Sequence, residues 1–173
     1  MKGSIVRVMC AAALVLGLSA AAHAQDHRCT NPGLEGSWAY TETGWVVTPA
    51  TPPATLAVAA VGKYTFDAAG TFTGSQYAST EGMGIGYDTK DGTYVLNEDC
   101  TATLTINGYR GGVLVRKSVW QIVLADNATE MRGISVSLEA LVPTPGGPVW
   151  VPFQPVMTLT GKRLARDRGN DQQ

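Results

Sequence analysis

Residues 101–107 read Thr-Ala-Thr-Leu-Thr-Ile-Asn, and their alternation indicates the fold class. Ala102, Leu104 and Ile106 fall on one face of an extended chain, whereas the threonines fall on the other. A period of two predicts a β-strand with one packed face and one solvated face, which is typical of antiparallel sheets.

The same alternation continues on both sides of this stretch, and helical periodicity is nearly absent after residue 24. Segments rich in Thr, Val, Gly and Tyr alternate with short turn signals. We expect an all-β protein of about eight antiparallel strands closed into a barrel, with a sandwich as the alternative. The expected strands are residues 35–43, 63–67, 71–78, 93–97, 101–107, 114–125, 130–138 and 156–164.

Two kinds of irregular segment separate these strands. The proline-rich residues 49–55 and 143–155 indicate long loops, because proline cannot donate to a strand ladder, and at one end of a barrel they would form its rim. Asp88, Lys90 and Asp91 are typical of a solvated turn, in which Asp bonds the local backbone. Their carboxylates are therefore not expected to have the buried surroundings that acid–base catalysis requires.

The first 24 residues match a secretory signal peptide. Lys2 and Arg7 precede an apolar run over residues 8–22, and the A-x-A motif that ends at Ala24 predicts a mature protein that begins at Gln25. The location that follows is periplasmic or secreted. We expect a signal peptide over 1–24, an N-terminal segment over 25–34, a single barrel domain over 35–164 and a polar tail over 165–173.

Removal of the signal peptide takes away Cys10 and leaves Cys29 and Cys100 as an even pair. In an oxidising compartment such a pair predicts a structural disulfide. The bridge would close a loop of about 72 residues, which the chain-entropy model values at roughly 4 kcal/mol. A redox or metal site is disfavoured, because C-x-x-C spacing is absent and nothing nearby supplies further ligands.

Several function classes are excluded by what the chain lacks. His27 is the single histidine after residue 24, so we expect neither a His-based catalytic site nor a metal site, and no cofactor. The chain has 13 basic and 14 acidic residues without a basic face, which disfavours nucleic acid as a partner. After Ala24 no apolar run approaches the roughly 20 residues that a membrane helix needs, and sparse aromatics with outward Thr and Ser disfavour a transmembrane barrel, so we do not expect an integral membrane protein.

Aromatic residues at inward positions are the candidates for a binding site. A barrel of about eight strands has an interior just wide enough for side chains or one small ligand. The candidates for a pocket wall are Trp38, Tyr64, Phe66, Tyr94 and Trp120, and core packing is the alternative role for each.

Two motifs resemble known families. Residues 92–106, from Gly92 through Cys100 to Ile106, resemble the G-x-Y-x-V-N-x-D-C-T-G-T hairpin of small secreted bacterial proteins, with Ala102 where glycine is usual. Those domains are similar to the allene oxide cyclase barrel and to calycins. The G-x-W sequence that ends at Trp38 also resembles the opening of lipocalins, although their T-D-Y element is missing. That resemblance implies that Arg163, on the last strand, packs over Trp38.

These observations leave three functional hypotheses. The first is a barrel that binds a small apolar or amphipathic ligand. The second is an isomerase or cyclase that uses the barrel interior, for which Glu81, Tyr94 and Arg132 are the candidate residues, and an inward titratable side chain would favour it. The third is a protein-interaction module such as a protease inhibitor, with a filled interior and a contact segment at 25–31 or 143–155.

Overall fold

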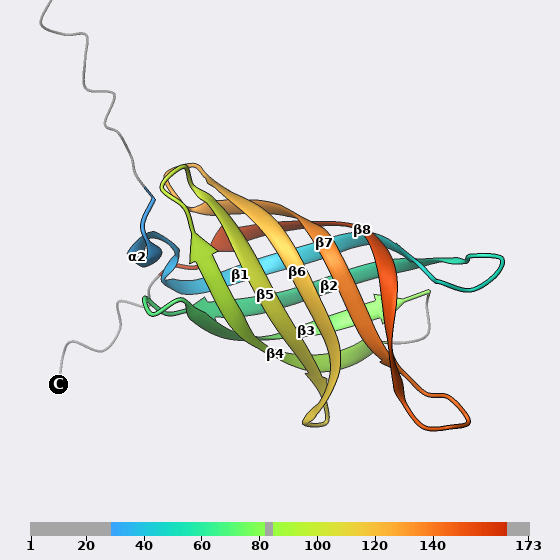
Figure 1. The fold of residues 1–173 in the computed structure, drawn as a ribbon. Helices are drawn as coiled ribbons and strands as arrows, with labels where there is room; N and C mark the ends of the chain where they lie inside the picture. Colours follow the sequence, from blue (N-terminus) through green and yellow to red (C-terminus); the bar gives the residue numbers. More distant parts are fainter. Residues whose placement is uncertain (1–28, 82–84, 166–173) are drawn as a thin grey trace, which may run out of the picture.

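Antiparallel strands close into a barrel in which each strand pairs with its neighbour in sequence and β8 pairs back with β1 (Figure 1). This computed structural model describes residues 29–81 and 85–165. The strands are β1 Gly36–Val47, β2 Thr55–Phe66, β3 Thr71–Thr80, β4 Ile85–Leu96, β5 Thr101–Arg110, β6 Val113–Ala125, β7 Glu130–Val142 and β8 Val149–Arg163. A short helix, α2 Asn31–Leu34, precedes β1. The closed all-β barrel is therefore confirmed, and the sandwich is not adopted.

The barrel has two different ends (Figure 1). At the α2 end, tight turns connect β2 to β3, β4 to β5 and β6 to β7. At the opposite end, which we call the loop end, the long connections over 48–54 and 143–148 project from the rim. The two proline-rich connections thus lie at one end, because consecutive antiparallel strands alternate in direction and both β1 and β7 run toward it.

Large apolar side chains fill the α2 end of the interior. The Trp38 side chain is fully buried, and its indole N–H donates to the Leu34 carbonyl at 2.9 Å. Leu34 itself is fully buried, and the short helix that contains it covers this end of the barrel. The remaining large members of the core include Phe66, Phe72, Leu104, Ile106, Met131 and Leu159.

Inward glycines make room for two stacked tyrosines. The rings of Tyr40 and Tyr64 stack with centroids 4.1 Å apart, and each lies across the ladder from a glycine, Gly62 and Gly74 respectively. A Cβ on Gly62 would lie 2.5 Å from the Tyr40 hydroxyl, and one on Gly74 would lie 2.7 Å from Tyr64 Cδ1. This alternation of small and large inward residues is how small barrels fit their interior.

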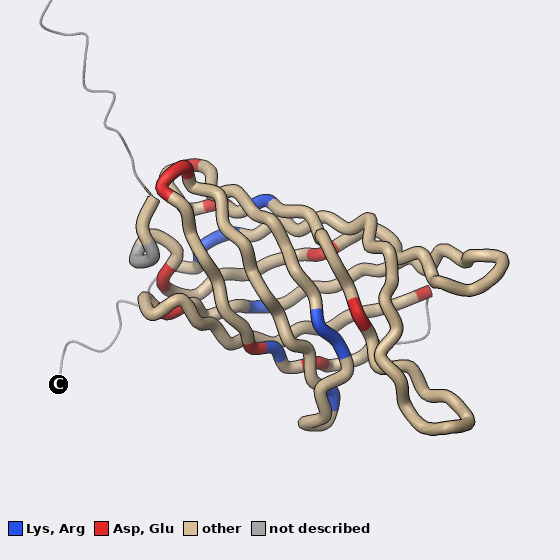
Figure 2. Tube along the Cα trace, in the orientation of Figure 1, with Lys and Arg blue, Asp and Glu red and all other residues tan. Residues whose placement is uncertain are grey.

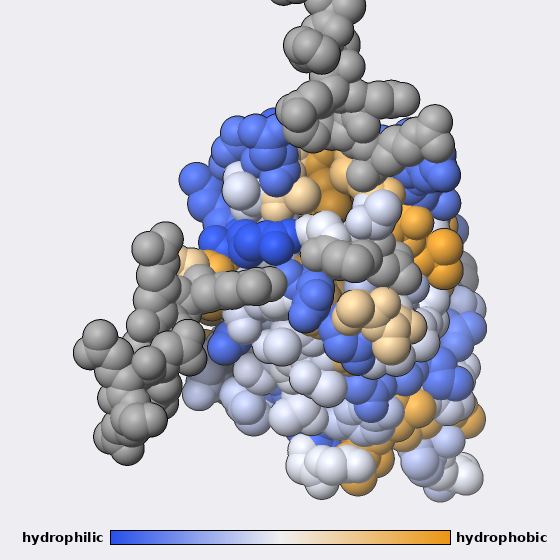
Figure 3. Space-filling model, turned by 90° about the vertical axis from the view of Figure 1, so that its left-hand side faces the viewer, coloured by the Kyte–Doolittle hydropathy of each residue, from blue (hydrophilic) through white to orange (hydrophobic). Residues whose placement is uncertain are grey.

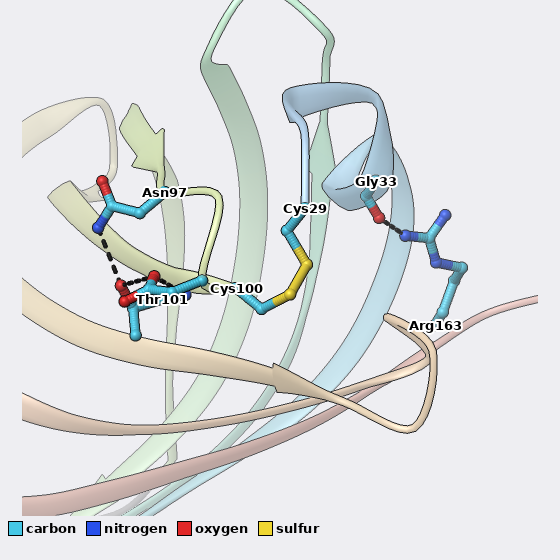
Figure 4. Close-up of a disulfide and its surroundings, with 7 residues drawn as sticks. Cys29, Gly33, Asn97, Cys100, Thr101 and Arg163 are labelled. Atoms are coloured by element: carbon cyan, nitrogen blue, oxygen red, sulfur yellow. Dashed lines mark hydrogen bonds between the residues drawn. A yellow bond between two sulfur atoms is a disulfide. The ribbon is translucent and has the colours of Figure 1, made fainter. Parts of the chain in front are cut away.

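The predicted disulfide joins Cys29 to Cys100 and ties the segment before β1 to the β4–β5 turn (Figure 4). The Cys29 N–H donates to the Glu98 carbonyl at 3.2 Å, beside the bridge.

Arg163 contacts α2 and the segments next to it. Its guanidinium lies 4.9 Å from the Trp38 ring and donates to the carbonyls of Gly33, Glu35 and Ala128. The packing of Arg163 over Trp38 that the lipocalin resemblance implied is thus confirmed.

Most strands are longer than the sequence predicts, and three of them begin seven or eight residues earlier than expected. β4 begins at Ile85 and contains Asp88, Lys90 and Asp91, so the prediction of a solvated turn there is wrong. β2 begins at Thr55 rather than at residue 63. β8 begins at Val149, so the loop ends before residues 149–155. In each case pairing with neighbouring strands outweighs local propensity, and proline is tolerated in β8 beside the register shift between β7 and β8.

The outer surface is mixed in charge and also exposes apolar side chains, among them Ile85, Val95 and Ile134. Figure 2 shows Lys and Arg lying among Asp and Glu along the strands rather than gathered on one face. Seen from the α2 end, apolar residues form small separated groups among hydrophilic ones (Figure 3). Among the described residues, no helix is long and apolar enough to cross a lipid bilayer.

Some predictions concern residues outside the described part of the chain. These are the signal peptide over 1–24, the single histidine His27 and most of the proposed tail, residues 166–173.

Candidate ligand-binding cavity

A cavity of about 170 Å³ occupies the loop side of the barrel interior. Its size is close to that of an engineered cavity of about 150 Å³ that binds benzene. Apolar side chains form most of its wall, and hydroxyl groups and three charged side chains interrupt them. The lining residues are Glu42, Val46, Leu56, Val58, Thr80, Lys90, Arg116, Ser118, Trp120, Ser135, Leu138, Ala140, Phe153 and Met157.

Hydrogen-bonded polar side chains form a layer between this cavity and the apolar core. We call this group the polar layer, and it consists of Tyr40, Glu42, Tyr64, Gln76, Asp88, Lys90 and Arg116. Buried charges are rare in proteins unless they are paired, because the transfer of an ion out of water is costly. The polar layer would therefore destabilise the barrel if any of its side chains lacked a hydrogen-bond or ion-pair partner.

Lys90 and Glu42 form the ion pair at the cavity. Lys90 Nζ lies 2.8 Å from Glu42 Oε1, and the two side chains are 3% and 5% exposed. The ammonium group also donates to the Tyr64 hydroxyl at 3.0 Å, and that hydroxyl donates to Glu42 at 3.3 Å. Nζ lies 5.0 Å from the centroid of the Tyr40 ring, within cation–π distance. Because Lys90 and Glu42 both line the cavity, a molecule bound there meets this pair directly.

Asp88 anchors the second half of the polar layer. Its carboxylate is 1% exposed and accepts from Arg110 Nε at 2.9 Å and from Arg116 Nη2 at 3.0 Å. Gln76 connects the two halves, because its amide donates to Asp88 at 3.4 Å and its oxygen accepts from the Tyr40 hydroxyl at 3.3 Å. Among the described residues, no buried side-chain nitrogen or oxygen lacks a hydrogen-bond partner.

Burial changes the acid–base properties of this layer. It lowers the pKa of Lys90 to about 8, and Arg116 acts in the same direction, whereas Glu42 opposes the shift by favouring the charged amine. Burial also raises the pKa of the Tyr64 hydroxyl well above its usual range, and the Glu42 carboxylate adds to this increase. At neutral pH the cavity therefore presents a lysine that releases its proton easily beside tyrosines that keep theirs.

The donors at the polar end favour a ligand that carries an acceptor oxygen. Lys90 and Arg116 present N–H groups, and Ser118 and Ser135 present hydroxyls on the same cavity. Within the described ranges, no three His, Cys, Asp or Glu side chains lie close enough together to hold a metal ion.

Of the five aromatic candidates, Trp120 lines the cavity, and its indole N–H donates to Ser118 Oγ at 3.2 Å. Tyr64 reaches the polar layer with its hydroxyl, while its ring packs edge-on against Phe66. Trp38 and Phe66 belong to the apolar core, and the Tyr94 hydroxyl donates to the Asp67 carbonyl at the α2 end. A role in ligand contact stays a prediction for all five.

The residues predicted for an isomerase or cyclase do not come together. Glu81 follows β3 at the loop end and is exposed, and its carboxylate accepts from the Ala57 N–H at 3.1 Å. Arg132 points outward from β7 toward Glu130, at 3.6 Å, and Tyr94 lies at the opposite end of the barrel. None of the three lines the cavity.

Sequence reasoning missed the charged residues of the polar layer, although a signal for them existed. Asp88 and Lys90 stand six and four residues before Tyr94, so a strand extended backward with a period of two places them on its inward face. Glu42 follows Trp38 and Tyr40 at the same spacing on β1.

No protein-family model matches the sequence, and the comparison with curated proteins found no match. A solved structure described as EF1p2_mFAP2b bound to DFHBI is similar in fold, with a TM-score of 0.49 and 13% sequence identity. The match covers 82% of this chain and 100% of that chain. None of these comparisons assigns the chain to a family.

Proposed function

We propose that this barrel binds one small amphipathic molecule in its loop-side cavity. The carrying observation is that apolar walls and a charged, fully hydrogen-bonded end meet in one cavity of about 170 Å³. The apolar part of the ligand lies against Trp120, Leu138 and Phe153. Its polar end carries an oxygen that accepts from Lys90 or Arg116.

The proposal has a physical basis in the different roles that apolar and polar groups have in ligand pockets. Apolar walls supply affinity through burial, at about 25 cal/mol per Å² removed from water, whereas a few placed polar groups fix orientation. The open cavity favours ligand binding over the protein-interaction hypothesis, which expected a filled interior. The disulfide is consistent with an extracytoplasmic location, which supports the proposed signal peptide and the periplasmic or secreted site of action.

The experiment is native mass spectrometry of the protein expressed in a bacterial periplasm, followed by titration with benzyl alcohol in a calorimeter. We expect extra mass that disappears on denaturation, and saturable binding of the alcohol. The absence of both captured mass and alcohol binding would contradict the proposal.

A pair of matched variants locates the binding. Ala140 lines the cavity, whereas Ala59 points outward from β2 and is exposed. Ala140→Phe places a ring where the ligand would lie and should abolish binding, whereas Ala59→Phe should bind like the wild type. Equal binding by both variants would place the ligand elsewhere on the protein.

A second candidate function, an isomerase or cyclase, is favoured by one observation. The interior contains titratable side chains that face the cavity, namely Glu42 and Lys90, with the Tyr64 hydroxyl in contact with both. Its signature would be exchange of ligand C–H protons with deuterated water in the presence of the protein, and this exchange should be lost in Glu42→Gln.

The packing of Arg163 over Trp38 supports a further proposal about the fold, namely that this barrel is related to calycin-like barrels.

A further inference from the structure

We propose that Lys90 captures aldehydes covalently, by forming an imine between its side-chain amine and the carbonyl carbon of a small apolar aldehyde held in the cavity. This inference rests on the proposed function, because the aldehyde must first occupy the same cavity. It adds the chemical class of the ligand and the atom that holds it.

The location of Lys90 meets the two structural conditions for a nucleophilic lysine. Such an amine is activated by desolvation in an apolar pocket or by a nearby cation. Lys90 is 5% exposed, and it lines a mostly apolar cavity together with Arg116. The other lysines whose side chains the structure describes, Lys63, Lys117 and Lys162, belong to the outer face of the barrel.

The neighbours of Lys90 can manage the protons of the reaction. The groups that face it are Tyr40 and Glu42 from β1, Tyr64 from β2, Asp88 from its own strand and Arg116 from β6. Glu42 Oε1, at 2.8 Å from Nζ, is the acceptor for the ammonium proton. Burial lowers the pKa of the amine to about 8, so a substantial share is neutral at mildly alkaline pH.

The reaction balances without an oxidant or a reductant. The neutral amine attacks the aldehyde carbon, the C–N bond forms, and the carbonyl electron pair moves to oxygen, which takes one of the two amine protons and becomes the hydroxyl of a carbinolamine. Glu42 then returns the proton it accepted to this hydroxyl, which leaves as water while the nitrogen lone pair forms the C=N bond. The remaining proton on nitrogen passes back to the Glu42 carboxylate, at 2.8 Å from Nζ. One amine and one aldehyde give one imine and one water.

The test is reductive trapping with benzaldehyde, whose ring matches the size of the cavity. The purified protein is incubated with benzaldehyde and cyanoborohydride near pH 8, digested and mapped by mass spectrometry for benzylated amines. We expect labelling of Lys90 at least about tenfold faster than labelling of the exposed Lys162, because the cavity holds the aldehyde beside Lys90 and burial lowers the pKa of its amine to about 8. Benzyl alcohol, which has no carbonyl group, should slow the labelling of Lys90 by competition.

Two variants provide controls. The double variant Glu42→Leu/Lys90→Met removes the amine and its counter-ion together, so that neither charge stays buried alone, and it should lose the fast label. Lys162→Met removes an exposed amine and should leave the fast label unchanged. Because the mapping is made on the wild-type protein, the result does not depend on the folding of any variant.

The outcomes separate the two proposals. Equal labelling of Lys90 and the surface lysines, in a protein that binds benzyl alcohol, would overturn covalent capture and leave ligand binding intact. If the protein binds neither compound and Lys90 is not labelled preferentially, both proposals fail. Fast labelling of Lys90 that benzyl alcohol suppresses supports both.

Discussion

Substitution of Lys90 tests whether the buried ion pair is as desolvated as its surroundings indicate. Lys90→Met removes the ammonium group and leaves Glu42, which is 4% exposed, with the Tyr64 hydroxyl as its remaining donor. Removal of one partner of a buried pair typically costs about 3–5 kcal/mol, because the other charge stays buried without compensation. Since small domains have a total stability of about 5–15 kcal/mol, this loss should be readily measured.

The double variant Glu42→Leu/Lys90→Met should recover most of this loss. Leu and Met fill similar volume without charge, and replacement of a buried ion pair by apolar residues is often neutral or stabilising. We expect its stability to lie within about 1 kcal/mol of the wild type. The single Glu42→Leu should cost less than Lys90→Met, since an amine with a pKa of about 8 escapes its buried charge by releasing a proton.

The assay is urea unfolding followed by tryptophan fluorescence at neutral pH, with the disulfide intact. Lys162→Met is the control, because Lys162 forms an exposed pair with Glu130 at 3.3 Å, which should be worth less than about 1 kcal/mol. The reasoning is refuted if Lys90→Met costs no more than this control. It is also refuted if the double variant loses the sum of both single effects, since that would mean the two charges are not coupled.

Three further predictions follow from other parts of the barrel. The free energy of unfolding, measured by urea titration, should increase by about 2 kcal/mol between pH 8 and about pH 10, because the folded state loses the Lys90 proton while the unfolded state keeps it. Above that range the free energy of unfolding should fall, because buried tyrosines such as Tyr64 ionise only in the unfolded state. Replacing Cys29 and Cys100 by Ala should lower stability by about 4 kcal/mol, since the bridge joins residues separated by 71 positions, and an unchanged urea midpoint would contradict this. Arg163→Lys should cost about 2 kcal/mol, because a single ammonium group cannot reproduce the forked hydrogen bonds at the α2 end, and thermal unfolding would measure it.

The polar layer connects stability with function. The interior contains four charged or amide side chains with 5% exposure or less, and their burial costs desolvation free energy that apolar side chains would not. These side chains surround the end of a cavity, and perturbed ionisable groups in clefts are concentrated at functional sites. The cost in stability is thus consistent with a chemical use of Lys90 and Glu42, which the trapping experiment addresses.

The sequence by itself determined the class of fold, the disulfide and the contact between Arg163 and Trp38. The alternation over residues 101–107 recurs along the chain, and a period of two permits only strands with an inner and an outer face. The pairing of Cys29 with Cys100 followed from the two cysteines that remain after the predicted signal peptide, and that of Arg163 with Trp38 from a short motif. These features are local or depend on few residues, so they can be recognised without knowing where distant strands lie.

Only the tertiary structure decided the site. Asp88 and Lys90 lie in a segment with strong turn propensity, yet pairing of β4 with β3 and β5 continues the strand through them and directs both side chains inward. Their partners come from β1, β2 and β6, far away along the chain. Closure of the barrel brings these groups together, and the interior withholds water from them. Whether a charged side chain is buried and paired therefore depends on the tertiary structure of the whole barrel. Which residues of a strand share a face depends only on the sequence of that strand.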